Sequence, residues 1–131
     1  MKKIAFVCIT NSCRSQMAEA FCLQLGKGQV KSYSAGLNPV FSIDENAIMV
    51  MAEKGIKMDN QYPKKMGDIP DCFDVLITLG DDSFDHYIKA DKREVWHLDD
   101  PKGKDINAYR RTRDLIYDKV EKLVNEIQVS V

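Results

Sequence analysis

The chain has 131 residues, 44% of them hydrophobic and 30% charged, with a formal net charge of −1. This length supports one hydrophobic core and is too short for two ordinary domains, so we predict a single catalytic domain over residues 1–131. The near-neutral charge gives no electrostatic reason to expect nucleic-acid or membrane partners. The apolar run at 4–9 is too short for a signal peptide or a transmembrane helix, and we therefore expect a cytoplasmic protein.

Strands and helices alternate along the predicted chain. Short apolar runs predict strands at 3–7, 30–34, 74–79 and 94–98. Periodic apolar spacing predicts helices at 15–25, 44–54, 83–89 and 105–128, with one further helical turn within 61–70. Ser42 and Glu45 have the spacing of a capping box for the second helix, while Gly26 and Gly55 follow the ends of the first two helices. The last helix is expected to bury Tyr109, Ile116, Val120, Leu123 and Ile127.

This alternation predicts an α/β fold of three layers, a four-stranded parallel sheet with helices on both faces. Such sheets bind ligands at the carboxyl ends of their strands, beside the point where the strand order reverses. The segment that leaves the first strand, residues 8–15, lies at that edge. We therefore expect the functional site there.

Residues 8–14, with the sequence CITNSCR, carry the strongest chemical signal. A loop that leaves a strand and enters a helix directs backbone N–H groups inward, next to the positive end of the helix dipole. A thiol at Cys8 is favoured there as a thiolate nucleophile. The guanidinium of Arg14 can contact two oxygens of a bound oxyanion, which a lysine does less well. The predicted oxyanion-binding loop comprises Ile9, Thr10, Asn11, Ser12, Cys13 and Arg14.

A structural role for Cys8 and Arg14 is the alternative, with a buried cysteine at the end of a strand and a solvated arginine at the start of a helix. A cysteine and an arginine five residues apart occur together by chance in many proteins. The position at a junction between strand and helix, with Ser15 directly after Arg14, favours the catalytic interpretation.

The chain resembles the low-molecular-weight protein tyrosine phosphatase superfamily, and within it the arsenate reductases related to those phosphatases. The matching segments are 8–15, its continuation 15–19 (SQMAE), 33–36 (YSAG) and 99–101 (DDP). Gln16 is typical of the reductase branch, because the phosphatases usually carry proline there. The resemblance implies the strand order 2-1-3-4 and a fold like that of the low-molecular-weight phosphatases.

The resemblance assigns a general acid to the aspartate before proline, which is Asp100. A carboxylic acid facing the nucleophile can protonate the leaving oxygen. Asp99 then has the interpretation of a solvated turn residue. Lys102 and Gly103 follow the proline, whereas the phosphatases usually carry aromatic residues there, and this difference suits an oxyanion smaller than phosphotyrosine.

Four further residues are predicted to support the loop. Ser15 would donate its hydroxyl to the Cys8 thiolate, and Asn11 would bond to the loop backbone. Glu19 and Ser34 match supporting positions in the reductase branch, with a helix-surface charge and a strand-end hydroxyl as the alternatives. Thr10 stands where glycine is frequent in the family, so a positive φ at that position would be strained.

The four cysteines do not indicate a disulfide framework in a cytosolic chain, and no spacing of cysteine or histidine indicates a metal site. Cys22 and Cys72 are expected to pack in the core. Cys13 either packs within the loop or forms a protective disulfide with oxidised Cys8. Thioredoxin-coupled reductases of the resembling branch carry two further cysteines after the third strand, but residues 81–90 contain none.

Three routes to turnover therefore remain open. An external small thiol with a glutaredoxin-like protein could regenerate Cys8, or Cys13 or Cys72 could replace the missing relay. Hydrolysis of a phosphate ester is the third route, because it needs no resolving thiol.

The predicted function is an arsenate reductase-like enzyme without a bound cofactor, using an external thiol as reductant. The alternative is a low-molecular-weight phosphatase that hydrolyses phosphotyrosine or another phosphomonoester through a cysteinyl-phosphate intermediate. A non-enzymatic oxyanion sensor is disfavoured, because Cys8, Arg14 and Asp100 are all present.

Overall fold

A computed structural model of the chain describes residues 1–80 and 88–129. The elements within these ranges are β1 (Lys2–Cys8), α1 (Arg14–Leu25), β2 (Val30–Gly36), α2 (Glu45–Ala52), the 3₁₀ turn η1 (Met66–Asp68), β3 (Cys72–Leu79), β4 (Lys89–Trp96) and α3 (Ile106–Val129). The strands form one parallel sheet in the order β2-β1-β3-β4. The predicted fold class and strand order are confirmed.

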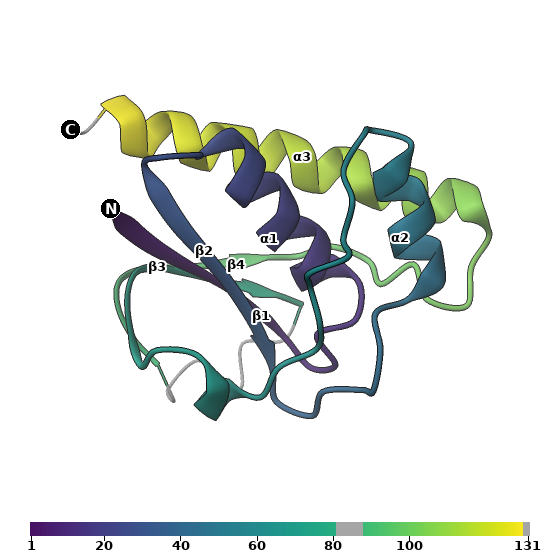
Figure 1. The fold of residues 1–131 in the computed structure, drawn as a ribbon, viewed down its shortest axis with the longest axis horizontal. Helices are drawn as coiled ribbons and strands as arrows, with labels where there is room; N and C mark the ends of the chain where they lie inside the picture. Colours follow the sequence, from purple (N-terminus) through teal and green to yellow (C-terminus); the bar gives the residue numbers. More distant parts are fainter. Residues whose placement is uncertain (81–87, 130–131) are drawn as a thin grey trace.

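The two faces of the sheet are covered differently (Figure 1). The helices α1, α2 and α3 pack on one face, where residues of α1 and α3 belong to the same core cluster as Ile4 and Phe6 of β1. The other face packs Ala5 and Val7 against the segment around η1, including Ile69. Successive side chains of a strand point to opposite faces, so β1 contributes to both halves of the core. The sequence predicts helices on both faces. Within the described ranges, the single turn η1 is the helical element on the second face.

Residues 83–87 of the predicted short helix 83–89 lie outside the described residues. Lys89 is instead the first residue of β4, which begins five residues before the predicted start at 94. The prediction depends on apolar runs, whereas the first part of this edge strand is charged and mostly exposed. Charged side chains are common on edge strands because they discourage pairing with other chains.

The predicted capping box of α2 is wrong. Asp44 is the N-cap, and its side chain accepts a hydrogen bond from the backbone N–H of Asn46 at 2.9 Å. The other carboxylate oxygen of Asp44 accepts from the hydroxyl of Tyr109 on α3 at 2.6 Å. Asp44 therefore caps α2 in place of Ser42, and the same side chain also bonds to α3.

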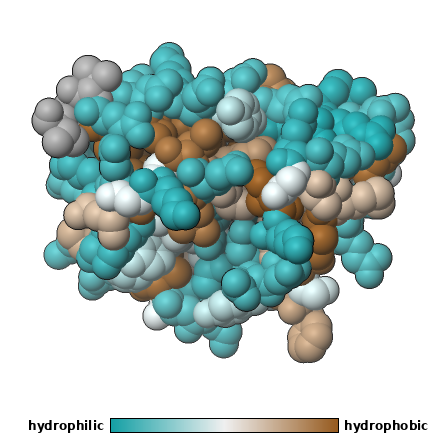
Figure 2. All heavy atoms as spheres, turned by 45° about the horizontal axis from the view of Figure 1, so that its top comes forward, coloured by the Kyte–Doolittle hydropathy of each residue, from teal (hydrophilic) through white to brown (hydrophobic). Residues whose placement is uncertain are grey.

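The apolar face predicted for the last helix is confirmed, since all five residues named for it are buried in α3. None of the helices in the described ranges is long and apolar enough to cross a membrane. Figure 2 shows one face of the molecule, where hydrophilic side chains cover most of the surface and apolar groups are visible between them.

Candidate active site

The loop after β1, residues 8–14, is called the anion loop below. Several of its carbonyl oxygens accept hydrogen bonds from one neighbouring segment of the chain, residues 37–44. Four backbone N–H groups of the segment 37–44 donate to it: Leu37 to Cys8 (3.2 Å), Asn38 to Ile9 (2.8 Å), Val40 to Thr10 (3.1 Å) and Asp44 to Ser12 (2.9 Å). In a trans peptide unit the carbonyl and the following N–H point in opposite directions. The N–H groups of the loop are therefore directed away from segment 37–44, towards the space above Cys8.

One of these N–H groups already faces the cysteine, since Asn11 donates to the Sγ atom of Cys8 at 3.2 Å. Within residues 1–80 and 88–129, the N–H groups of Thr10, Ser12 and Cys13 have no protein acceptor. A ring of inward donors without protein partners binds the oxygens of a tetrahedral anion. The anion loop therefore has the geometry of an oxyanion cradle.

Ser15 lies beneath the cysteine, with its Oγ atom 2.8 Å from Cys8 Sγ. The side-chain amide of Asn11 donates to the same Oγ at 2.8 Å. Because Oγ accepts from Asn11, its own proton is free to be donated to a thiolate on Cys8. The structure brings these two residues to Cys8, and their support of catalysis stays a prediction.

Asn11 gives the loop its bend. It has φ of +52°, and among the described residues it is the non-glycine residue with positive φ. Asparagine tolerates this conformation better than most residues. Thr10 does not adopt it, so the strain considered at that position does not arise. Gln16 stabilises the bend by donating to both the backbone oxygen (3.0 Å) and the side-chain oxygen (2.9 Å) of Asn11.

Gly36 at the end of β2 makes room for the loop. It is in register with Cys8, and a Cβ atom placed on it would lie 2.7 Å from the carbonyl oxygen of Ile9. Any larger residue would push the anion loop out of place. This close approach gives a physical reason for a glycine at the end of the segment 33–36.

Arg14 reaches the cradle from the first turn of α1. Its Nη1 atom donates to the carbonyl oxygen of Leu98 at 2.7 Å, and its Nη2 atom lies 3.7 Å from Oδ2 of Asp100. Gly80, with φ of +101°, lies beneath the guanidinium, because a Cβ there would come within 3.1 Å of Nη1. These contacts orient the arginine and leave its remaining N–H groups available to an anion.

Asp100 lies at the entrance to this site. Its carboxylate is about half exposed, at 49%, and it accepts from the backbone N–H of Lys102 at 3.1 Å. The structure therefore brings Asp100 next to Arg14, which lies at the end of the anion loop that begins with Cys8. The roles predicted for them are compatible with this geometry and stay predictions.

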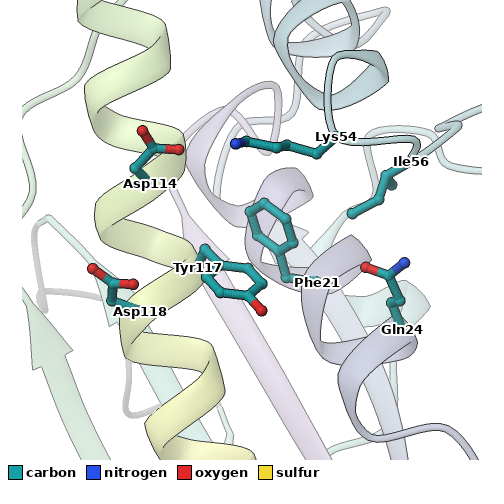
Figure 3. A pocket seen from close by; sticks show the side chains of 7 residues that line it. All are labelled: Phe21, Gln24, Lys54, Ile56, Asp114, Tyr117 and Asp118. Atoms are coloured by element: carbon teal, nitrogen blue, oxygen red, sulfur yellow. The ribbon is translucent and has the colours of Figure 1, made fainter.

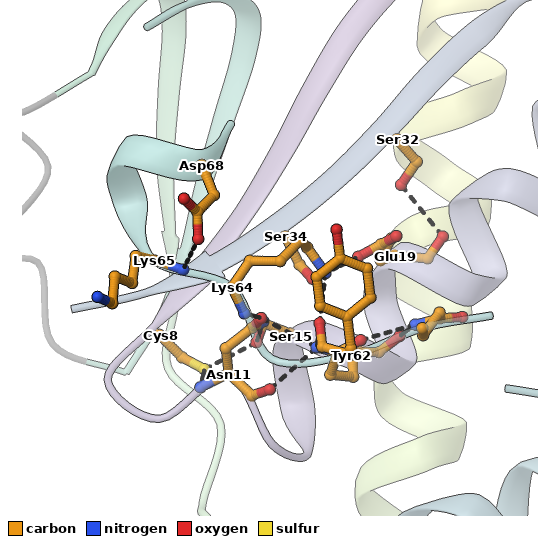
Figure 4. A network of polar contacts seen from close by, with 12 residues as sticks. Cys8, Asn11, Ser15, Glu19, Ser32, Ser34, Tyr62, Lys64, Lys65 and Asp68 are labelled. Carbon is orange, nitrogen blue, oxygen red and sulfur yellow. Dashed lines mark hydrogen bonds and ion pairs between the residues drawn. The ribbon is translucent and has the colours of Figure 1, made fainter. Parts of the chain in front are cut away.

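A buried ion pair supports the loop from behind (Figure 4). Lys64 Nζ lies 3.4 Å from Oε1 of Glu19 and donates to the carbonyl oxygen of Tyr62 at 2.7 Å. Ser34 donates to the same Oε1, and the backbone N–H of Lys64 donates to the side chain of Asn11 at 2.9 Å. Glu19 is 8% exposed, so the alternative of a helix-surface charge is wrong. Burial raises the pKa of Glu19, and Lys64 and Ser34 oppose that rise.

Sequence reasoning missed Lys64, together with the contacts from Leu98 and Gly80. Lys64 follows Pro63 in a segment without regular secondary structure, where no periodicity indicates which side chains point inward. The contribution of Leu98 is a backbone oxygen, which its residue type does not reveal. Only Gly80 left a signal, as a glycine directly after a buried strand.

We expect Lys64→Met to lower the free energy of unfolding by about 3 kcal/mol at pH 8, because it leaves the Glu19 carboxylate buried without its cation. The loss should be smaller at pH 5. A carboxyl whose pKa is raised in the folded state destabilises the fold as the pH rises through that folded pKa. Losing Lys64 raises the pKa of Glu19 further, so the pH dependence should steepen. Urea denaturation at both pH values measures this difference.

Lys65→Met is the matched control, because the Lys65 side chain is exposed and adjacent in sequence. It should change the free energy of unfolding by less than about 0.5 kcal/mol. Equal losses in the two variants, or a loss in Lys64→Met that does not change with pH, would contradict the supporting role of the ion pair.

The other cysteines differ from Cys8. Cys22 is buried in the core as predicted, and burial raises its pKa to about 11. Cys13 is also buried, and burial, followed by the charge of Asp44, raises its pKa. The core prediction for Cys72 is wrong, since β3 begins at this residue and its side chain is exposed at the N-terminal end of the strand.

Cys72 also lies far from the nucleophile. In the register of β1 with β3, Val7 pairs with Thr78, so Cys8 is level with Leu79 at the opposite end of β3 from Cys72. At the rise of about 3.3 Å per strand residue, the two cysteines are roughly 20 Å apart. A disulfide requires Cα atoms within about 7 Å, so Cys72 cannot resolve Cys8 in this fold.

The described ranges contain no group of three or more His, Cys, Asp or Glu residues that could hold a metal ion. A hollow of about 450 Å³ lies between α1 and α3, lined by Phe21, Gln24, Lys54, Ile56, Asp114, Tyr117 and Asp118 (Figure 3). None of these residues belongs to the anion loop. The hollow is therefore separate from the candidate active site.

The fold and the loop define a class of α/β protein, in which a cysteine at the carboxyl edge of a parallel sheet lies beneath inward backbone donors and beside an arginine. A family model described as low molecular weight phosphotyrosine protein phosphatase matches residues 3–131. The chain belongs to this family.

Its similar relatives carry a narrower description. Glutaredoxin arsenate reductase of Synechocystis sp. is 36% identical over 131 residues, which cover 97% of this chain and 99% of that protein. Arsenate reductase 1 of Staphylococcus epidermidis is 34% identical over 130 residues, covering 96% and 98%. A solved structure of an arsenate reductase in the phosphate binding state superposes with a TM-score of 0.88 at 36% identity, covering 97% and 99%. A tyrosine phosphatase of Erwinia amylovora, at 22% identity and a TM-score of 0.80, shares the fold.

Proposed function

We propose that this chain reduces arsenate to arsenite, with Cys8 as the nucleophile and an external small thiol as the reductant. The observation that carries the proposal is the cradle of N–H groups around Cys8, with Arg14 at the end of the same loop and Asp100 at 3.7 Å from the Arg14 guanidinium. Relatives that match nearly the full length of the chain and are named arsenate reductases support the choice of oxyanion.

The first step forms a bond between Cys8 sulfur and arsenic. The thiolate attacks arsenate held by the loop amides and Arg14, and one arsenic–oxygen bond breaks. Asp100 protonates the departing oxygen, which leaves as water. The N–H donors and the guanidinium stabilise the negative charge that develops on the other oxygens.

The second step transfers electrons to arsenic. An external thiolate attacks Cys8 sulfur, so that a disulfide bond forms, the sulfur–arsenic bond breaks and its electron pair stays on arsenic, which leaves as arsenite. A second thiol then attacks the mixed disulfide and releases Cys8. In sum, one arsenate and two thiols give one arsenite, one disulfide and one water.

The cysteines of the chain itself are poorly placed for this role. Residues 81–90 contain no cysteine, and Cys72 lies at the far end of β3. Cys13 is close to the loop but buried with a raised pKa, which makes it a slow nucleophile. A small thiol, assisted by a glutaredoxin-like protein, remains the suitable reductant. Such thiols are kept reduced in the cytoplasm, where we place the reaction.

We expect multiple turnovers of arsenate with reduced glutathione and glutaredoxin, and little or none with thioredoxin and its reductase. The measurement is arsenite formed per enzyme over time. Cys72→Ser should leave the glutathione-driven rate within about twofold, because its sulfur cannot reach Cys8. Thioredoxin-driven turnover that disappears in Cys72→Ser would show that the proposed route is wrong.

Hydrolysis of a phosphomonoester is the second candidate function. It is favoured by the family model, which is that of the phosphotyrosine phosphatases, and by a chemistry that needs no resolving thiol. Asp100 would then protonate an alkoxide or phenoxide leaving group. Rapid hydrolysis of phenyl phosphate, together with no arsenite formed with any thiol, would establish this candidate in place of the first.

A further inference from the structure

A second, smaller hollow adjoins the loop that carries Asp100. It has a volume of about 270 Å³ and lies between the segment after β4 and the first turns of α3. This volume is slightly below the usual range for small-molecule pockets, so it suits one end of a small ligand. The residues that give it chemical character are His97, Leu98, Asp99, Lys104, Arg111 and Thr112.

Thr112 lines this pocket with a hydroxyl group. The residue is 7% exposed, and its side chain forms no hydrogen bond with any residue in the described ranges. No buried side-chain oxygen or nitrogen in the described ranges lacks a hydrogen-bond partner, so the unbonded Thr112 hydroxyl is open to the hollow. An open hydroxyl at this position can bond to water or to a ligand.

The charged side chains around Thr112 are also available to a ligand. Lys104 and Arg111 line the pocket and form no ion pair within residues 1–80 and 88–129. Asp99 also lines the pocket and adds one negative charge. Two cations and one carboxylate around a small pocket complement a zwitterion, with a carboxylate held by Arg111 and an ammonium held by Asp99.

The pocket is linked to the active site through Leu98. This residue lines the pocket, and its carbonyl oxygen accepts a hydrogen bond from Arg14 at 2.7 Å. Asp100 is the next residue after Asp99 and lies 3.7 Å from Arg14. A molecule bound in the pocket would therefore contact Leu98, which holds Arg14, and Asp99, which directly precedes Asp100.

We propose that this pocket binds the amino-acid end, ammonium together with carboxylate, of the small thiol that reduces arsenylated Cys8. The inference rests on the proposed function, because it names the chemical class of that thiol. Binding at this end leaves the sulfur to attack Cys8, forming the sulfur–sulfur bond as the sulfur–arsenic bond breaks and arsenite leaves. A reductant without such an end gains nothing from the pocket.

The binding test uses S-methylglutathione, which has the amino-acid end and no reactive thiol. Isothermal titration should give a dissociation constant at least fivefold higher for Arg111→Gln and for Thr112→Val than for the unmodified chain. Lys122→Gln, which removes an exposed cation elsewhere on α3, is the matched control and should not change it. Equal dissociation constants in all four proteins would overturn the proposal.

The amino group is tested separately. An N-acetylated S-methylglutathione should bind several-fold more weakly than the parent compound to the unmodified chain. In Asp99→Asn the two compounds should bind equally, because the carboxylate that distinguishes them is gone. A difference of the same size in both proteins would overturn the assignment of Asp99.

Kinetics separate this inference from the proposed function. The ratio of kcat/KM with glutathione to kcat/KM with 2-mercaptoethanol, which has no amino-acid end, should fall at least fivefold in Arg111→Gln and stay constant in Lys122→Gln. A constant ratio in Arg111→Gln would reject the pocket while arsenate reduction stands. Absence of arsenite with every thiol would instead reject the proposed function, and the binding measurements would still decide whether the pocket recognises an amino-acid end.

Discussion

Cys8→Ser should abolish turnover and leave oxyanion binding nearly intact. The substitution removes the sulfur that must bond to arsenic, and a serine hydroxyl is a far weaker nucleophile at neutral pH. Loss of a nucleophile commonly costs about 10⁴- to 10⁶-fold in kcat. The cradle itself is made of backbone N–H groups, whose directions depend on the carbonyl contacts of segment 37–44 rather than on the thiol.

Two measurements test this result together. Arsenite formation and phenyl phosphate hydrolysis should both fall to background, while titration with inorganic phosphate should give a dissociation constant within about threefold of the original. Cys22→Ser is the matched control for a buried cysteine outside the anion loop, and its residual activity should follow its folded fraction. Substantial turnover in Cys8→Ser would remove Cys8 from the role of nucleophile.

Arg14→Lys should lose both turnover and oxyanion binding. The guanidinium uses Nη1 for the carbonyl oxygen of Leu98 and still has N–H groups that can face an anion. An ammonium has no planar fork, so it cannot hold that carbonyl and pair with two anion oxygens in the same geometry. Losing such a preorganised donor typically costs about 10²- to 10³-fold in kcat.

Phosphate titration and arsenite formation again report the two effects, and here both should change. Arg110→Lys is the matched control, because Arg110 lies on α3 and pairs at the surface with Glu53 at 2.7 Å. It should leave turnover unchanged within about twofold, since a surface ion pair contributes little. Full phosphate affinity in Arg14→Lys would show that the backbone donors alone hold the anion.

Several parts of the active site are predictable from the amino-acid sequence alone. The spacing of Cys8 and Arg14, and their position between an apolar strand and an amphipathic helix, are local properties of the sequence. The junction between strand and helix leads us to expect inward loop amides. Their observed direction depends on the contacts of the loop carbonyls with segment 37–44. Asp100 requires the family resemblance, because an aspartate before proline is common in ordinary turns.

Two of the failed predictions, the burial of Cys72 and the start of β4, have a common physical cause. Cys72 is predicted in the core because it precedes an apolar run. Its burial depends instead on where β3 begins and on what covers that end of the strand. The sequence does not reveal the start of β4, because an edge strand obtains its hydrogen bonds from β3 and does not need an apolar sequence. In both cases the neighbouring strand decides the outcome.

The sequence by itself determined the fold class and, through its family resemblance, the strand order, and it led to the prediction of Cys8 as the nucleophile with Arg14 beside it. These depend on apolar periodicity and on residues close together in the chain. Only the tertiary structure decided that Leu98 and Gly80 orient Arg14, and that Lys64 neutralises Glu19 behind the loop. The physical reason is that these contacts join segments 45 or more residues apart. They depend on the backbone oxygen of Leu98, the absent side chain of Gly80 and the buried charge of Lys64. Their positions follow from packing and not from local sequence.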